Sequence, residues 1–139
     1  KHSCRIDETL CREMMQGRPL RMDAIDAVIY RKFCLWQNER LLQPKVIVEY
    51  DRRPYVYRDG NVRVTFDMNI RSGNDIEGFL DDMLVTRPAM PVNQHVLEVK
   101  FDELIPDFLY AAVQTEKLRQ TTYSKYYICR KYNPGGINA

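Results

Sequence analysis

The chain has 139 residues, of which 45% are hydrophobic and 29% charged, with a net charge of +2. This composition is typical of one globular domain, and so small a charge without a Lys/Arg-rich run argues against nucleic-acid binding. No stretch approaches the roughly 18 apolar residues of a membrane span, and the first residues lack the apolar core of a signal peptide. Because the chain lacks an initiator Met, we expect an excised or processed piece.

The first part of the chain predicts helices. Asp7 is a good N-cap for a helix over about residues 8–16, which Gly17 would end. A second helix is expected over about residues 23–42, because its apolar residues recur largely at helical spacing. The apolar stripe around Trp36 is expected to be core.

The chain then changes to extended patterns. A strand is expected from Pro44 to Arg52, and Pro54 just beyond it indicates a sheet edge or a bulge. Asp59-Gly60 predicts a hairpin turn between a short strand over residues 55–57 and a strand over residues 62–68. The later expected elements are a turn at 72–75, a strand over 95–102, a helix over 107–115 with Pro106 in its first turn, and a strand or helical turn over 122–132.

Helices followed by hairpin strands predict an α+β fold with an antiparallel sheet. We expect one domain with a mainly helical part over residues 1–43, a β-rich part over residues 44–132 and a tail over residues 133–139. Four cysteines are scattered without a C-x-x-C pair: Cys4, Cys11, Cys34 and Cys129. Without a secretory signal they are expected to be reduced thiols of a cytoplasmic protein.

Two of the expected strands separate apolar from charged residues. In one, Leu97, Val99 and Phe101 alternate with Glu98 and Lys100. The other repeats this alternation with an apolar set, Val62, Val64 and Phe66, and a polar set, Arg63, Thr65 and Asp67. An apolar face needs a core, whereas a charged face needs water, a charged ligand or a metal. Strands of this kind predict a barrel or cupped sheet with a polar lumen.

Four segments resemble, in the same order, the VTC domain of bacterial polyphosphate polymerases, within the CYTH superfamily of triphosphate tunnel metalloenzymes. They are residues 48–55 (VEYDRRPY), 60–67 (GNVRVTFD), 96–108 (VLEVKFDELIPDF) and 123–126 (YSKY). The likeness is to the C-terminal half of the tunnel. The resemblance therefore implies a partial tunnel-type domain, which a missing half or a partner chain would complete.

The resemblance implies a tunnel lined with Lys and Arg that holds a nucleoside triphosphate and a growing polyphosphate chain, with Mn²⁺ or Mg²⁺. The motifs assign phosphate contacts to Tyr50, Arg52, Arg63, Ser124 and Lys125, and metal binding to Glu98. Among these, Arg52, Arg63 and Lys125 are expected to be catalytic. Lys100, Tyr50 and Ser124 are expected to bind substrate. Arg71 is expected to do so too, because it lies on the same strand face as Arg63 if the strand continues to residue 71.

These residue types suit phosphoryl transfer, which needs in-line positioning and positive charge around the transferred group. The planar fork of Arg can bind phosphate oxygens bidentately, and a carboxylate is a hard ligand for Mg²⁺. Each assignment has a structural alternative: a solvated ion pair of Glu98 and Lys100, an ion pair of Arg63 and Asp67, cross-strand packing of Tyr50, and a cap or turn hydroxyl at Ser124.

We therefore expect a polyphosphate polymerase that transfers the terminal phosphoryl group of a nucleoside triphosphate to polyphosphate. Three alternatives stay open. The chain could bind polyphosphate or another polyanion, such as an inositol phosphate, without turnover. It could hydrolyse tripolyphosphate, or it could have a purely structural role.

Overall fold

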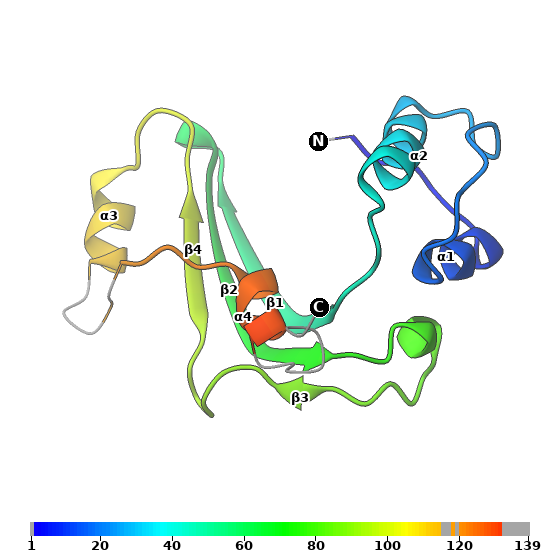
Figure 1. Ribbon diagram of the computed structural model, residues 1–139. Coiled ribbons are helices and arrows are strands. Elements are labelled where there is room, and N and C mark those ends of the chain that lie inside the picture. The colour runs from blue at the N-terminus through cyan, green and yellow to red at the C-terminus, as the bar shows by residue number, and fades with distance from the viewer. Residues whose placement is uncertain (1, 115–117, 119, 132–139) are drawn as a thin grey trace.

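The computed structural model describes residues 2–114, 118 and 120–131. Four α-helices and four strands make up the described fold, joined by two short 3-10 helices (Figure 1). In chain order they are α1 (Glu8–Met15), α2 (Val28–Arg40), β1 (Ile47–Tyr57), η1 (Asp59–Asn61), β2 (Val62–Gly73), η2 (Glu77–Leu80), β3 (Arg87–Pro88), β4 (Val96–Lys100), α3 (Asp107–Val113) and α4 (Lys125–Lys131).

Local sequence signals place the first helix correctly and the second only in part. The Asp7 carboxylate accepts a hydrogen bond of 2.8 Å from the backbone N–H of Leu10, which makes Asp7 the N-cap of α1. Gly17 follows that helix with a φ of 65°. The second helix begins at Val28, later than expected, because the carboxylate of Asp23 binds Arg21 instead of capping a helix.

Helices α1 and α2 form a unit to one side of the sheet (Figure 1). Their shared core consists of Leu10, Leu20, Tyr30 and Cys34. The expectation that Trp36 is core is wrong, since this residue is 50% exposed and stacks with the guanidinium of Arg40. Helix α2 presents only the face of Tyr30, Cys34 and Gln37 to the core, so Trp36 lies on its outer side.

The sheet is antiparallel, with β2 at its centre. Strand β1 pairs with one edge of β2, whereas β3 and β4 pair with the two ends of the other edge. The hairpin expected at Asp59-Gly60 is present, and Gly60 has a φ of 74°. Within the described residues neither β1 nor β4 has a second neighbouring strand, so the sheet is open. The fold is therefore α+β, with an open antiparallel sheet consistent with part of a tunnel.

Some expected boundaries shift. Strand β1 continues through Pro54 to Tyr57, which an edge strand tolerates because the missing N–H points away from its neighbour. Ser72 and Gly73, expected in a turn, belong to β2. The chain near residue 125 forms a helix and not a strand. The tail expected from residue 133 lies outside the described residues.

An extra residue in β2 divides the sheet into two registers. Glu49 pairs with Arg71, but Asp51 pairs with Met68, so β2 contains one residue more than β1 across this step. Asn69 lies there with a φ of 52°, a left-handed conformation that Asn adopts more readily than most residues. As a result, the alternation of β2 side chains between the two faces of the sheet is shifted by one residue after Asn69. An odd-numbered residue after Asn69 therefore lies on the opposite face from an odd-numbered residue before it.

One face of the sheet, here called the polar face, is defined by residues that the register places side by side: Arg52, Arg63, Thr65, Asp67, Glu98 and Lys100. Helix α4 covers part of it, since Lys125 binds Asp67 and Ser72 donates a hydrogen bond of 3.0 Å to the carbonyl oxygen of Cys129. No described helix is long and apolar enough to cross a membrane.

The opposite face is apolar and only partly covered. Helix α3 contacts it through Phe108, whose ring meets that of Tyr57 edge to face at 5.3 Å. Val62 is buried, but Phe66 is 40% and Tyr55 58% exposed. The apolar pattern predicts a core against this face, and in the described chain that core covers the face only in part, while the buried positions of β2 include the polar residues Thr65 and Asp67.

Candidate functional site

Asp67 is the centre of the polar face. Its side chain is fully buried, and its two oxygens accept hydrogen bonds of 2.6 Å and 2.8 Å from Nε and Nη2 of Arg52. Lys125 Nζ of α4 lies 2.6 Å from Oδ2 of the same carboxylate. The hydrogen bond from Arg52, reinforced by Lys125, holds the pKa of Asp67 below its ordinary value despite burial. One carboxylate therefore fixes two cations.

Tyr50 holds the same two cations from another side. Its ring centroid lies 5.2 Å from Cζ of Arg52 and 5.2 Å from Nζ of Lys125, both within cation–π range. Tyr50 also packs against the buried cluster of Ile70, Ala89 and Cys129. The aromatic ring thus fixes the stems of both cations while leaving their remaining N–H groups for other acceptors.

Glu98 lies beside this group on β4. Its Oε1 is 2.7 Å from Lys100 Nζ, and its Oε2 is 3.6 Å from Nη2 of Arg52. The hydrogen bond from Lys100 is the main cause that lowers the pKa of Glu98. The carboxylate is ionised at neutral pH and remains 33% exposed, so it can still accept a ligand.

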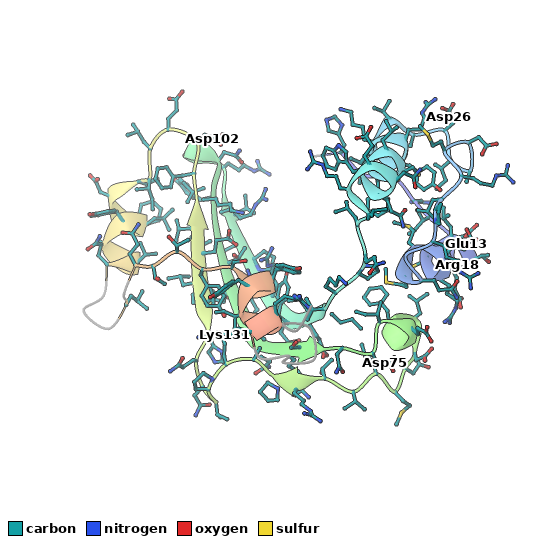
Figure 2. All side chains as sticks on the ribbon, viewed as in Figure 1. Glu13, Arg18, Asp26, Asp75, Asp102 and Lys131 are labelled. Atoms are coloured by element: carbon teal, nitrogen blue, oxygen red, sulfur yellow. The ribbon has the colours of Figure 1, made fainter. Side chains whose placement is uncertain are left out.

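Arg63 extends the basic surface toward the hairpin end of the sheet. It lies opposite Lys100 in the strand register, and the two line a depression of about 510 Å³. At this end, where Asp102 is labelled in Figure 2, Asn61 donates a hydrogen bond of 2.9 Å to Asp102. The alternative ion pair of Arg63 with Asp67 is absent, since Arg63 makes no salt bridge with any described residue.

The local charge balance favours an anion. Four cationic side chains, Arg52, Arg63, Lys100 and Lys125, accompany three carboxylates: Asp67, Glu98 and Asp102, which lines the same depression as Arg63 and Lys100. Four cations and three carboxylates leave an excess of one positive charge. Positive charge held on a partly buried surface attracts polyanions more strongly than the same charge in open solvent.

A divalent cation finds only one available carboxylate here. No group of three His, Cys, Asp or Glu that could hold a metal occurs in the described part of the chain. Asp67 is fully buried and both of its oxygens bind cations at short distance, whereas Glu98 is 33% exposed and its Oε2 lies 3.6 Å from Nη2 of Arg52. This leaves Glu98, of the two carboxylates beside Arg52, as the protein ligand that a metal could reach. That fits Mg²⁺, which commonly takes one or two carboxylates and completes its shell with phosphate oxygens and water.

Two residues of the expected site have other partners. The Oγ of Ser124 accepts a hydrogen bond of 3.2 Å from the N–H of Tyr127, as a helix cap does. The expectation that Arg71 shares the face of Arg63 is wrong, because the extra residue at Asn69 reverses its orientation. Arg71 instead binds the hydroxyl and carbonyl oxygens of Thr86 and lies 3.6 Å from Glu49.

The structure also adds residues that sequence reasoning did not assign to the site. Asp67 organises both cations, and Thr65 is buried beside it on the polar face. The alternation of Arg63, Thr65 and Asp67 places all three on one face, which was a usable signal. It does not reveal which cation pairs with Asp67, because that depends on the register of β1 and the docking of α4.

Comparison with known proteins supports the resemblance seen in the motifs. The family model of the VTC domain matches residues 1–132. No curated protein and no solved structure matches the chain. With nearly the whole chain matched by the family model, the protein belongs to the VTC domain family.

Proposed function

We propose that the polar face binds polyphosphate and that the chain is part of a polyphosphate polymerase. The observation that supports this most strongly is the pair Arg52 and Lys125, held together on one buried carboxylate. Arg carries five N–H donors and Lys three, so both retain donors that Asp67 does not use. They would bind phosphate oxygens without first being ordered, which lowers the entropic cost of binding.

The remaining residues would extend this contact along a chain of phosphates. Arg63 has no salt bridge with a described residue, and Lys100 is 68% exposed, so both can turn toward a ligand. Their distribution along β2 and β4 suits a linear polyanion better than a single phosphate. Glu98 would hold the divalent cation, Mn²⁺ or Mg²⁺, that neutralises phosphate charge during transfer.

In the proposed reaction, the terminal phosphoryl group of a nucleoside triphosphate passes to the end of the polyphosphate chain. The bond from the terminal phosphorus to the bridging oxygen of the donor breaks, and a bond to a terminal oxygen of the acceptor forms. The side chains of Arg52, Arg63 and Lys125 would stabilise the charge on the equatorial oxygens and align donor with acceptor.

A binding module without turnover is the second candidate. It is favoured by the presence of a single available carboxylate, Glu98, and by a sheet that is open in the described residues. Such a module would still use the basic residues for affinity. It would not depend on Glu98, which already lies between two cations.

The two functions separate in one set of assays on wild type and Glu98→Ala, with Glu103→Ala as a control on an exposed carboxylate nearby. With ATP as the donor, tripolyphosphate as primer and Mn²⁺, a polymerase lengthens the primer, and Glu98→Ala abolishes this. Release of inorganic phosphate without lengthening identifies a hydrolase.

A binding module instead shows no turnover, and its affinity for tripolyphosphate survives in Glu98→Ala. The proposal is contradicted if the chain shows no turnover and binds tripolyphosphate no better than an unrelated protein of similar charge. Unchanged turnover in Glu98→Ala would show that Glu98 takes no part in the reaction.

A further inference from the structure

Thr65 has a buried hydroxyl without a partner. The residue is 4% exposed, and its Oγ1 makes no hydrogen bond within the described residues. Burying a hydroxyl without a hydrogen bond is unfavourable, and most buried polar atoms have a partner. Thr86, which is 8% exposed, shows the usual situation, since its hydroxyl accepts from Arg71 and donates to Glu49.

The position of Thr65 suggests what the missing partner is. On the polar face it lies between Pro54 of β1 and Glu98 of β4 in the strand register. Its neighbours two residues away along β2 on the same face are Arg63 and Asp67. Paired side chains have Cβ atoms about 5 Å apart, so the hydroxyl lies within the charged group that we assign to phosphate.

The side chains around Thr65 can make room for a ligand. Arg52 and Glu98 are 38% and 33% exposed, and their 3.6 Å contact is longer than the contacts that each makes with Asp67 or Lys100. A polyanion that competes for Arg52 would weaken this contact with Glu98. The Thr65 hydroxyl, which is next to Glu98 in the strand register, would then lie beside the ligand.

We propose that Thr65 is a substrate-contacting residue that donates its O–H to a phosphate oxygen of the bound polyanion. This inference rests on the proposed function. A Val side chain has nearly the shape of Thr and is equally suited to a strand, so packing alone does not require the hydroxyl. A ligand that accepts a hydrogen bond does require it.

The test compares Thr65→Val and Thr65→Ser with Thr86→Val on the opposite side of the sheet, using inorganic tripolyphosphate as probe. Thr65→Val should weaken binding about tenfold, since a hydrogen bond to a charged acceptor is lost. Its thermal midpoint should stay equal or rise, because an unpartnered buried hydroxyl is removed. Thr65→Ser should bind within a few-fold of wild type, because its hydroxyl remains.

Thr86→Val should behave in the opposite way, with a lower thermal midpoint and unchanged affinity, because its hydroxyl has two protein partners. If wild type binds tripolyphosphate and Thr65→Val binds equally well, this inference is overturned while the proposed function stands. A lowered midpoint in Thr65→Val would also overturn it, since the hydroxyl would then have a structural partner. If wild type itself does not bind tripolyphosphate, the proposed function is contradicted, and the inference that rests on it is overturned as well.

Discussion

At the scale of single residues, Asp67 controls the arrangement of the polar face. A fully buried carboxylate is stable only when it is paired and hydrogen-bonded, and here Arg52 and Lys125 meet both conditions. Removing its charge leaves two cations close together without their counter-ion. Asp67 is therefore a positioning residue, which acts through the two cations that it holds.

Asp67→Asn should lower the free energy of unfolding at neutral pH by about 2–4 kcal/mol, which urea denaturation can measure. The control is Asp26→Asn, where an exposed carboxylate pairs with Arg31 on the surface and little change is expected. Equal stabilities of Asp67→Asn and wild type would contradict the central role of this carboxylate.

The stability difference between wild type and Asp67→Asn should also depend on pH. The folded-state pKa of Asp67 is lowered, so its stabilising contribution is fully present above the unfolded value of about 3.9. The contribution is lost as pH falls below that value toward the folded-state pKa. The stability difference between wild type and Asp67→Asn should therefore shrink below about pH 4. A difference that stays constant down to the acid transition would contradict this.

The sequence predicted the residue types of the site but not its contacts. Arg52, Lys125 and Glu98 were identified from short motifs, and the structure brings all three to one face. The strand pattern relates Asp67, the common partner of Arg52 and Lys125, only to its neighbour Arg63. Pairing across strands depends on register, which involves residues distant in sequence and cannot be read from one strand alone.

At the scale of elements, the docking of α4 completes the site. This helix contributes Lys125 to Asp67 and buries Cys129 against Ile70 and Ala89 of the sheet region. A helix of seven residues is not stable alone in water, so its capping and its packing on the sheet must hold it. Loss of either would move Lys125 away from the site.

Ser124→Ala should lower the free energy of unfolding by about 1 kcal/mol, because the N–H of Tyr127 loses its acceptor. Ser124→Asp should restore the stability, since Asp is an equally good cap. If Ser124 also lies at the phosphate, as its motif implies, Ser124→Asp should nevertheless bind tripolyphosphate more weakly than Ser124→Ala. Stabilities of wild type and Ser124→Ala that do not differ would show that the cap is unimportant.

Elements set by local signals were predictable, whereas those set by packing were not. The Asp7 cap and the Asp59-Gly60 turn each depend on a few adjacent residues, and both are present. The orientation of Arg71 was mispredicted because Asn69 adds a residue to β2, and strand alternation alone does not reveal a bulge. Trp36 was mispredicted because helical spacing does not show how much of a helix surface will be covered.

At the scale of the whole molecule, the described chain has two separate cores. One lies between α1 and α2 around Cys34, and the other lies under α4 around Cys129. Each core therefore contains one fully buried thiol, whereas Cys4 is exposed. Burial raises the pKa of the Cys129 thiol, which further lowers its reactivity.

Labelling of the native chain with a thiol reagent at neutral pH should modify Cys4 quickly and both Cys34 and Cys129 slowly. In urea all four cysteines should react at similar rates, which gives the control for intrinsic reactivity. Different rates for Cys34 and Cys129 would show that the two cores open independently. A Cys129 that reacts as fast as Cys4 would contradict the packing of α4 on the sheet.

The most direct test of the central claim is calorimetric titration of the chain with tripolyphosphate, with and without Mn²⁺, for wild type, Arg63→Ala and Arg53→Ala. Arg63 has no salt bridge with a described residue, so its removal should not disturb the fold. Arg53 pairs with Phe66 on the apolar face and is the matched control.

We predict binding that Mn²⁺ strengthens, an affinity at least about tenfold weaker in Arg63→Ala, and an unchanged affinity in Arg53→Ala. Equal losses in the two variants would mean that only net charge matters. No binding by wild type, or equal affinities of wild type and Arg63→Ala, would contradict the assignment of the polar face as a polyphosphate site.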